Sequence, residues 1–79
     1  MKKTARPLHK IASEIKKDWK DVYFGAVPYL NAMSTLNTID DMYGMDSAKM
    51  IVLYFLSNAS TWKGETARRI KKELKEITK

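Results

Sequence analysis

The feature that most constrains the fold is an unbroken run of seven apolar residues, Met50 to Leu56. A helix that is apolar on every side must be enclosed by protein. The alternative is a buried strand, because several residues of the run favour β structure and periodicity does not separate the two. Asp46 and Ser47 are typical helix N-cap residues, however, and no other stretch looks able to pair with the run as a strand. The sequence therefore predicts a central, enclosed helix that begins at Asp46.

Two amphipathic helices are expected before this segment. Pro7 suits the first position of a helix, and the apolar residues that follow recur at helical spacing: Leu8, Ile11, Ala12, Ile15, Trp19 and Val22. Gly25 is expected to supply the positive φ of a helix cap. Pro28 then opens a short second helix with the stripe Tyr29, Leu30, Met33 and Leu36. The connection 37–45 is expected to hold at most one helical turn, from Thr38 to Tyr43, ended by Gly44.

A last helix is expected near the C-terminus. Its apolar stripe is Ala67, Ile70, Leu74 and Ile77. Glu65 is expected to pair with Arg69, four residues later on the helix. The four helices predict an all-α fold, a compact four-helix domain around a central apolar helix. Residues 1–79 form this single helical domain, with residues 1–6 as a flexible basic arm.

The size of the chain also bears on its assembly. A domain of 79 residues buries only about 60% of the surface that it exposes when unfolded, and this one has no cysteine. We therefore expect a homo-oligomer, which would gain burial by self-association. The longest apolar run is too short to span a bilayer, so we expect a cytoplasmic protein with no membrane partner.

Charge is distributed in blocks along the chain. The net charge of +6 divides into +4 for residues 1–22, −2 for residues 23–61 and +4 for residues 62–79. Two basic segments around an apolar middle favour anionic partners such as nucleic acid, nucleotides, phospholipid or an acidic protein. The other interpretation is a solvated surface that keeps a small protein soluble.

Three patterns in the second part of the chain carry a resemblance. They are Pro28-Tyr29-Leu30-x-Ala32-Met33, then Tyr43-Gly44-x-Asp46-Ser47, and then Ile51-Val52-x-Tyr54-Phe55-Leu56-x-Asn58-Ala59-x-Thr61-Trp62-x-Gly64-x-x-Ala67-Arg68. Together they resemble a family of small bacteriophage-encoded proteins of unassigned function. The resemblance supplies no catalytic or ligand-binding assignment. It implies an accessory or counter-defence factor in the host cytoplasm that binds host proteins, nucleic acids or nucleotides.

Catalysis and metal binding are not expected. The chain has no cysteine, and its single histidine, His9, falls on the polar side of the first helix, far in sequence from any residues that would complete a triad. The spacing of Asp40, Asp41 and Asp46 lacks the alternation and closing Glu of a calcium loop. Asp46 suits an N-cap, and Asp40 and Asp41 suit the first turn of a helix. We predict no enzyme activity, no metal and no cofactor.

The best candidate site is the junction before the last helix. Helix N-termini suit phosphate groups, and the junction adds hydroxyl groups, positive charge and a tryptophan face on which a base could stack. Gly64 allows close backbone approach, whereas Glu65 would oppose an anion. The candidate phosphate-binding residues are Ser60, Thr61, Trp62, Lys63, Arg68, Arg69 and Lys72. The same residues also suit an ordinary helix cap with a core tryptophan and a solvated basic face.

Three functions fit these observations. The first is a non-enzymatic counter-defence protein that sequesters a nucleotide-type ligand. The second is a nucleic-acid-binding protein that uses the basic C-terminal helix; sequence-specific readout is not expected, because that helix has no Asn or Gln. The third is an inhibitor that docks on a host protein through aromatic surface, if Tyr23, Phe24 and Tyr29 are exposed together.

Overall fold

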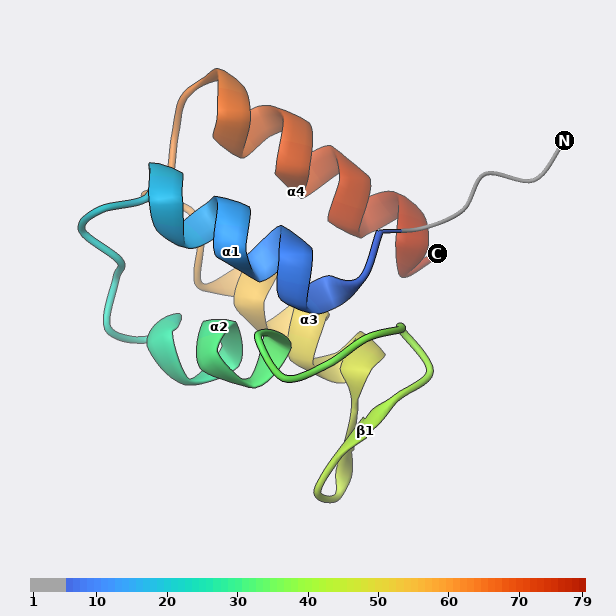
Figure 1. Ribbon diagram of the computed structural model, residues 1–79. Coiled ribbons are helices and arrows are strands. Elements are labelled where there is room, and N and C mark those ends of the chain that lie inside the picture. Colours follow the sequence, from blue (N-terminus) through green and yellow to red (C-terminus); the bar gives the residue numbers. More distant parts are fainter. Residues whose placement is uncertain (1–5) are drawn as a thin grey trace, which may run out of the picture.

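Four helices and one short hairpin make up the computed structural model, which describes residues 6–79 (Figure 1). The elements are α1 (Leu8–Asp18), α2 (Val27–Met33), β1 (Met42–Tyr43), β2 (Asp46–Ser47), α3 (Ala48–Ser57) and α4 (Glu65–Ile77). Helix α1 contacts α4 on one side and α2 on the other, and α2 packs against α3. The prediction of four helices is confirmed, but the fold is not purely α-helical. Of the expected basic arm, all but Arg6 lies outside the described residues.

Helix α1 follows the predicted apolar spacing but ends at Asp18, before the last two residues of the predicted stripe, Trp19 and Val22. Leu8, Ile11, Ala12 and Ile15 are buried, and Trp19 is buried directly after the helix. Pro7 is the N-cap residue rather than the first helical residue. The first two N–H groups of the helix donate to the carbonyls of Asn37 and Leu36, each at 2.9 Å. These bonds satisfy donors that a helix leaves unpaired, and they fix the start of α1 to the segment after α2.

Helix α2 is short, as predicted, and its Leu30 and Met33 are buried. Leu36, predicted as part of the same stripe, is also buried but lies beyond the end of the helix. The expected role of Gly25 was wrong, because only Gly44 and Gly64 have a positive φ within residues 6–79. A side chain at position 25 would instead place its Cβ 2.6 Å from Cε2 of Tyr23 and 2.9 Å from Oδ1 of Asn58. Glycine is needed here for close approach.

The connection before α3 is a β-hairpin and not a helical turn. Met42 pairs with Ser47, and Tyr43 pairs with Asp46. The two residues of the hairpin loop are Gly44, whose φ is 62°, and Met45, whose φ is not positive. A positive φ at the first loop residue alone is typical of a type II′ turn. The predicted helical turn from Thr38 to Tyr43 was therefore wrong. A turn closed by the Asp41 N–H and the Thr38 carbonyl at 3.1 Å comes first, and Met42 and Tyr43 then pair in the hairpin.

Asp41 stabilises the entry to the hairpin. Its carboxylate accepts hydrogen bonds from the Asn37 N–H at 2.8 Å, the Thr38 N–H at 3.1 Å and the Thr38 hydroxyl at 3.0 Å. These bonds lower the pKa of Asp41, because each one favours the ionised carboxylate. Asp41 therefore closes the turn that begins at Asn37 and Thr38. The prediction that Asp41 lies in the first turn of a helix was wrong.

Helix α3 begins two residues later than predicted and is not enclosed. The Ser47 hydroxyl caps it by accepting the Met50 N–H at 3.2 Å. One face is buried through Ala48, Ile51, Val52 and Phe55. On the opposite face Met50, Leu53 and Tyr54 are 39%, 38% and 40% exposed. The prediction of a fully enclosed helix was wrong, because the other helices pack on one side of α3 only.

Helix α4 packs against α1 and completes the core. Ala67, Ile70 and Leu74 are buried as predicted, and Ile77 is half-buried against the same cluster. Its N-cap is Gly64, whose φ of 113° is strained for any residue with a side chain. Within residues 6–79 no helix has the length and apolar character needed to cross a membrane.

Candidate anion-binding site

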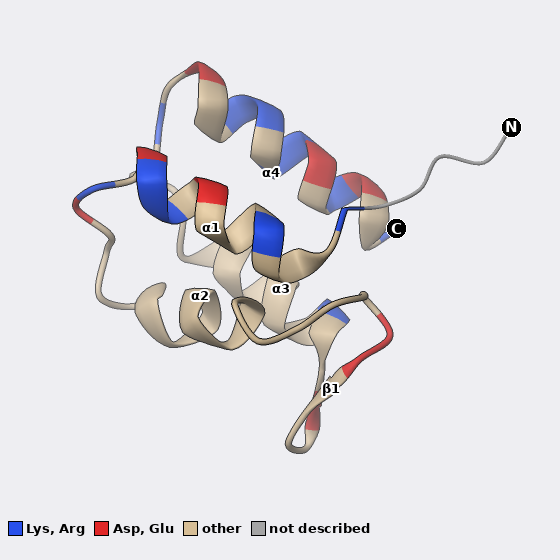
Figure 2. Cartoon of the chain, viewed as in Figure 1, with Lys and Arg blue, Asp and Glu red and all other residues tan. Residues whose placement is uncertain are grey.

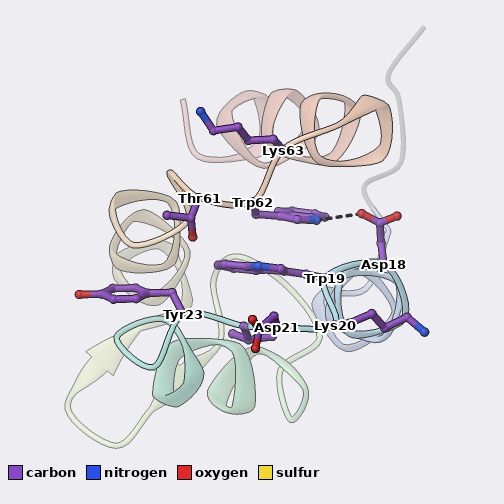
Figure 3. Close-up of a pocket in the computed structure, with 9 residues that line it drawn as sticks. Asp18, Trp19, Lys20, Asp21, Tyr23, Thr61, Trp62 and Lys63 are labelled. Atoms are coloured by element: carbon purple, nitrogen blue, oxygen red, sulfur yellow. Dashed lines mark hydrogen bonds between the residues drawn. The ribbon is translucent and has the colours of Figure 1, made fainter.

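Trp62, the expected stacking platform, belongs to the core. Only 2% of its surface is exposed, and its ring stacks on that of Trp19 with centroids 5.6 Å apart and an interplanar angle of 11°. Phe55 meets the Trp62 ring edge-on at 6.4 Å. The indole N–H donates to Oδ2 of Asp18 at 2.8 Å (Figure 3), as a buried tryptophan requires. One face of Trp62 is therefore already occupied, and a nucleobase cannot stack there without displacing Trp19.

Two shallow hollows adjoin Trp62. The larger, of about 720 Å³, is lined by Asp18, Trp19, Lys20, Asp21, Val22, Tyr23, Thr61, Trp62 and Lys63 (Figure 3). The smaller, of about 340 Å³, is lined by Ser60, Trp62, Lys63, Gly64, Ala67, Arg68 and Lys71. Two carboxylates and two lysines line the larger hollow, so its charge is balanced. Every charged residue that lines the smaller hollow is a cation, which makes it the better site for an anion.

Lys71 lines the smaller hollow but was not among the predicted site residues. Its Nζ donates to the Trp62 carbonyl at 2.6 Å and lies 5.9 Å from the centroid of the Trp62 ring. Partial burial lowers the pKa of Lys71, and the neighbouring charges of Lys63 and Lys75 lower it further. Spacing could have indicated it, since residues 68, 71 and 75 follow one another at helical intervals of three and four. We call Lys63, Arg68, Lys71 and Lys75 the basic cluster.

Only some of the predicted site residues meet at this hollow. Ser60, Trp62, Lys63 and Arg68 line it. Thr61 lines the larger hollow instead, and Lys72 is exposed and lines neither. Arg69 turns toward α1, where its guanidinium donates to the Glu14 carboxylate. Glu65 forms no ion pair with Arg69 among residues 6–79, so that predicted pair was wrong; Glu14 takes its place.

Four charged side chains fasten α4 to the start of the chain. The Arg6 guanidinium donates to Glu73 at 2.7 and 2.9 Å and to Glu14 at 2.9 Å, and Glu14 also accepts from Arg69. Arg69 and Arg6 lower the pKa of Glu14, and the two carboxylates raise the pKa of Arg6. We call these residues the charged seam. The seam neutralises Arg69, whereas no residue of the basic cluster forms an ion pair within residues 6–79.

Charged residues are concentrated on two of the helices. Figure 2 shows Lys and Arg interspersed with Asp and Glu on α1 and α4, while α2 carries no charge and α3 carries only Lys49. Residues 6–79 contain no group of three or more His, Asp or Glu side chains that could hold a metal ion. The arrangement is thus suited to contact with an anion over α4.

No protein-family model, curated protein or solved structure matches the chain. The resemblance to small bacteriophage proteins therefore remains a prediction from the sequence patterns alone.

Proposed function

We propose that this protein is a non-enzymatic binding protein that holds phosphate groups on its basic cluster. The observation that carries the proposal is the environment of Lys71. Its ammonium group is held against the Trp62 carbonyl, partly removed from water, and repelled by Lys63 and Lys75. A bound anion would relieve this repulsion and would raise the pKa of Lys71.

The backbone at the start of α4 adds to the attraction for an anion. Gly64 has no side chain with which to cap the helix, and no other side chain caps it within residues 6–79. The first-turn N–H groups are therefore available, and they carry the positive end of the helix dipole. Glu65 lies in the same turn and opposes an anion there. This opposition favours phosphate contacts nearer Arg68 and Lys71 than the helix end.

Between the two phosphate-bearing ligands, the geometry favours nucleic acid over a single nucleotide. A nucleotide site would use Trp62 as a stacking platform, but that ring is buried against Trp19. Arg68 and Lys75 lie seven residues apart on α4, which corresponds to about 10 Å along the helix axis. One DNA strand carries a charge about every 3.4 Å of its axis, so the cluster spans roughly three phosphates.

The binding is expected to be independent of base sequence. Helix α4 contains no Asn or Gln, and its exposed cations are suited to phosphate oxygens rather than to base edges. Backbone binding of this kind depends steeply on salt, because each phosphate contact releases counterions. In the phage context that the sequence resemblance implies, such a protein would act as an accessory or counter-defence factor that occupies nucleic acid.

The test is fluorescence anisotropy of a labelled DNA duplex between about 50 and 200 mM salt. We expect micromolar affinity at low salt and a steep loss of affinity as salt rises. The double variant Arg68→Gln/Lys71→Gln should reduce the slope of log K against log[salt] by roughly 2. Lys49→Gln is the matched control for one lost charge, because Lys49 is exposed on α3; its slope should equal that of the wild type.

Two results would overturn the proposal. One is an absence of DNA binding at low salt, and the other is a double variant that keeps both the affinity and the slope of the wild type. Competition with ATP separates the two ligand classes. If ATP binds more tightly than the duplex, the nucleic-acid proposal fails and nucleotide sequestration takes its place.

A further inference from the structure

The exposed side of α3 is an apolar surface that anion binding does not explain. Four residues share the exposed face of the helix, because they are spaced three or four positions apart: Met50, Leu53, Tyr54 and Ser57. Each of the three apolar residues is more than a third exposed. The Tyr54 ring is supported from one side by Tyr29, with centroids 5.4 Å apart. This face is ordered and apolar, and it has no partner within residues 6–79.

Aromatic residues from the loop before α2 extend this surface. Tyr23 and Phe24 pack together with centroids 4.9 Å apart, and Phe24 is 80% exposed. Gly25 lies against both the Tyr23 ring and the side chain of Asn58, which places the aromatic pair at the C-terminal end of α3. We define the apolar face as Tyr23, Phe24, Val27, Met50, Leu53 and Tyr54, all of them exposed.

The area of the apolar face matches what a dimer needs. At about 200 Å² for a large side chain, the exposed fractions of its six residues amount to roughly 500 Å². About 65% of the area of a homodimer interface is apolar. If the roughly 500 Å² of exposed apolar area supplies that fraction, the whole interface covers roughly 800 Å² on each partner. Stable protein interfaces bury about 800 Å² on each partner.

The charge distribution selects a second copy of this chain as the occupant. None of the six residues is charged, and the cations Lys20 and Lys63 adjoin the face only where they line the same hollow as Tyr23. An anionic membrane or nucleic acid would therefore find cations only at its edge. Among the helices, α2 carries no charge and α3 carries only Lys49, whereas the other helical Lys and Arg residues belong to α1 and α4 (Figure 2). Two copies that meet through α3 therefore bring few like charges together.

We propose that the apolar face is the interface of a homodimer in which two α3 helices pack antiparallel across a two-fold axis. A two-fold interface uses the same surface on both copies, and a stripe of Met, Leu and Tyr at helical spacing can pack against itself. The dimer encloses the helix face that the single chain leaves open. It also leaves both basic clusters on the outside.

Light scattering coupled to size-exclusion chromatography tests the interface. We expect the wild type to have twice the 9.1 kDa mass of the chain at about 100 µM. Leu53→Glu places an unpaired charge at the centre of the face and should weaken the dimer about 100-fold or more. Met45→Glu is the matched control, because Met45 is 96% exposed in the hairpin and outside the apolar face; this variant should remain a dimer.

A wild type that is monomeric at this concentration would overturn the homodimer and would assign the face to a different protein. A dimer that survives both Leu53→Glu and Tyr54→Glu would also overturn it. Circular dichroism establishes that each variant is folded. If Leu53→Glu does not fold, Met50→Lys serves as the second variant, since residue 50 is equally exposed.

Discussion

Glu14 offers the sharpest test of how α4 is held to the rest of the molecule. Its carboxylate accepts from Arg69 on α4 and from Arg6 at 2.9 Å, and Arg6 in turn binds Glu73. The substitution Glu14→Gln keeps the shape of the side chain and removes its charge. It should therefore weaken the charged seam without leaving a cavity.

The expected loss of stability is modest because the seam is partly exposed. The side chains of Glu14, Arg6 and Arg69 are 32%, 39% and 53% exposed. Ion pairs in such positions contribute about 0.2 to 1 kcal/mol each, and Gln retains one hydrogen-bond acceptor. Two pairs with Glu14 give an expected loss of about 1 kcal/mol, which corresponds to a decrease in Tm of roughly 5 °C for a domain of this size.

The pH dependence supplies the decisive measurement. Because the folded protein lowers the pKa of Glu14 from its ordinary value of 4.5, the unfolded chain takes up a proton first as the pH falls. The stabilisation is therefore complete well above pH 4.5 and is lost as the pH falls through the lowered pKa. Urea unfolding of wild type and Glu14→Gln should differ at pH 7, and the difference should shrink as the pH falls below 4.5 and through the lowered pKa. Asp41 titrates in both proteins, so its contribution cancels in the difference.

Glu76→Gln is the control for a carboxylate outside the seam. Glu76 pairs with Lys79 at 3.7 Å, and both side chains are more than half exposed. We expect a change below about 0.3 kcal/mol. The seam would be refuted as a stabilising element if Glu14→Gln unfolded at the wild-type urea concentration at pH 7, or if the difference between the two proteins did not shrink as the pH fell below 4.5.

Three further substitutions test local features of the fold. Gly25→Ala brings a Cβ within 3 Å of both Tyr23 and Asn58 and should cost about 1 to 3 kcal/mol in urea unfolding; an unchanged midpoint would show that the close approach is not needed. Ser47→Ala removes the N-cap of α3 and should cost about 1 kcal/mol, measured as a lower Tm. Trp62→Ala empties a core position and should cost about 3 to 5 kcal/mol, so a variant with native near-UV circular dichroism and an unchanged Tm would contradict its place in the core.

Helix positions were predictable because their signal is local. An amphipathic helix repeats its apolar residues every three or four positions, so the stripe Ala67, Ile70 and Leu74 could be identified without knowledge of any partner. The start of α3 was predicted to within two residues for the same reason, since an N-cap acts on the next turn of its own helix. The hairpin was missed because its strands are only two residues long and show no alternation.

The candidate site was predicted only in outline. Cations close together on α4 follow from helical spacing, and Lys63 and Arg68 do line one hollow. The partner of Arg69 does not follow from spacing, because Glu14 is 55 residues away and competes with the local carboxylate of Glu65. The lowered pKa of Lys71 does not follow from spacing either, because its largest cause is burial and the next is the charge of the loop residue Lys63, and both depend on the fold.

The sequence by itself determined that this chain is mostly helical, that its ends are basic and that one segment is apolar all round, because these properties depend on neighbours within a few residues. The tertiary structure alone decided which surfaces are buried. It turned Trp62 onto Trp19, bound Arg69 to Glu14 and left one face of α3 exposed. A domain of this size can bury only part of its apolar surface. Contacts between segments that are distant in sequence determine which side chains are buried.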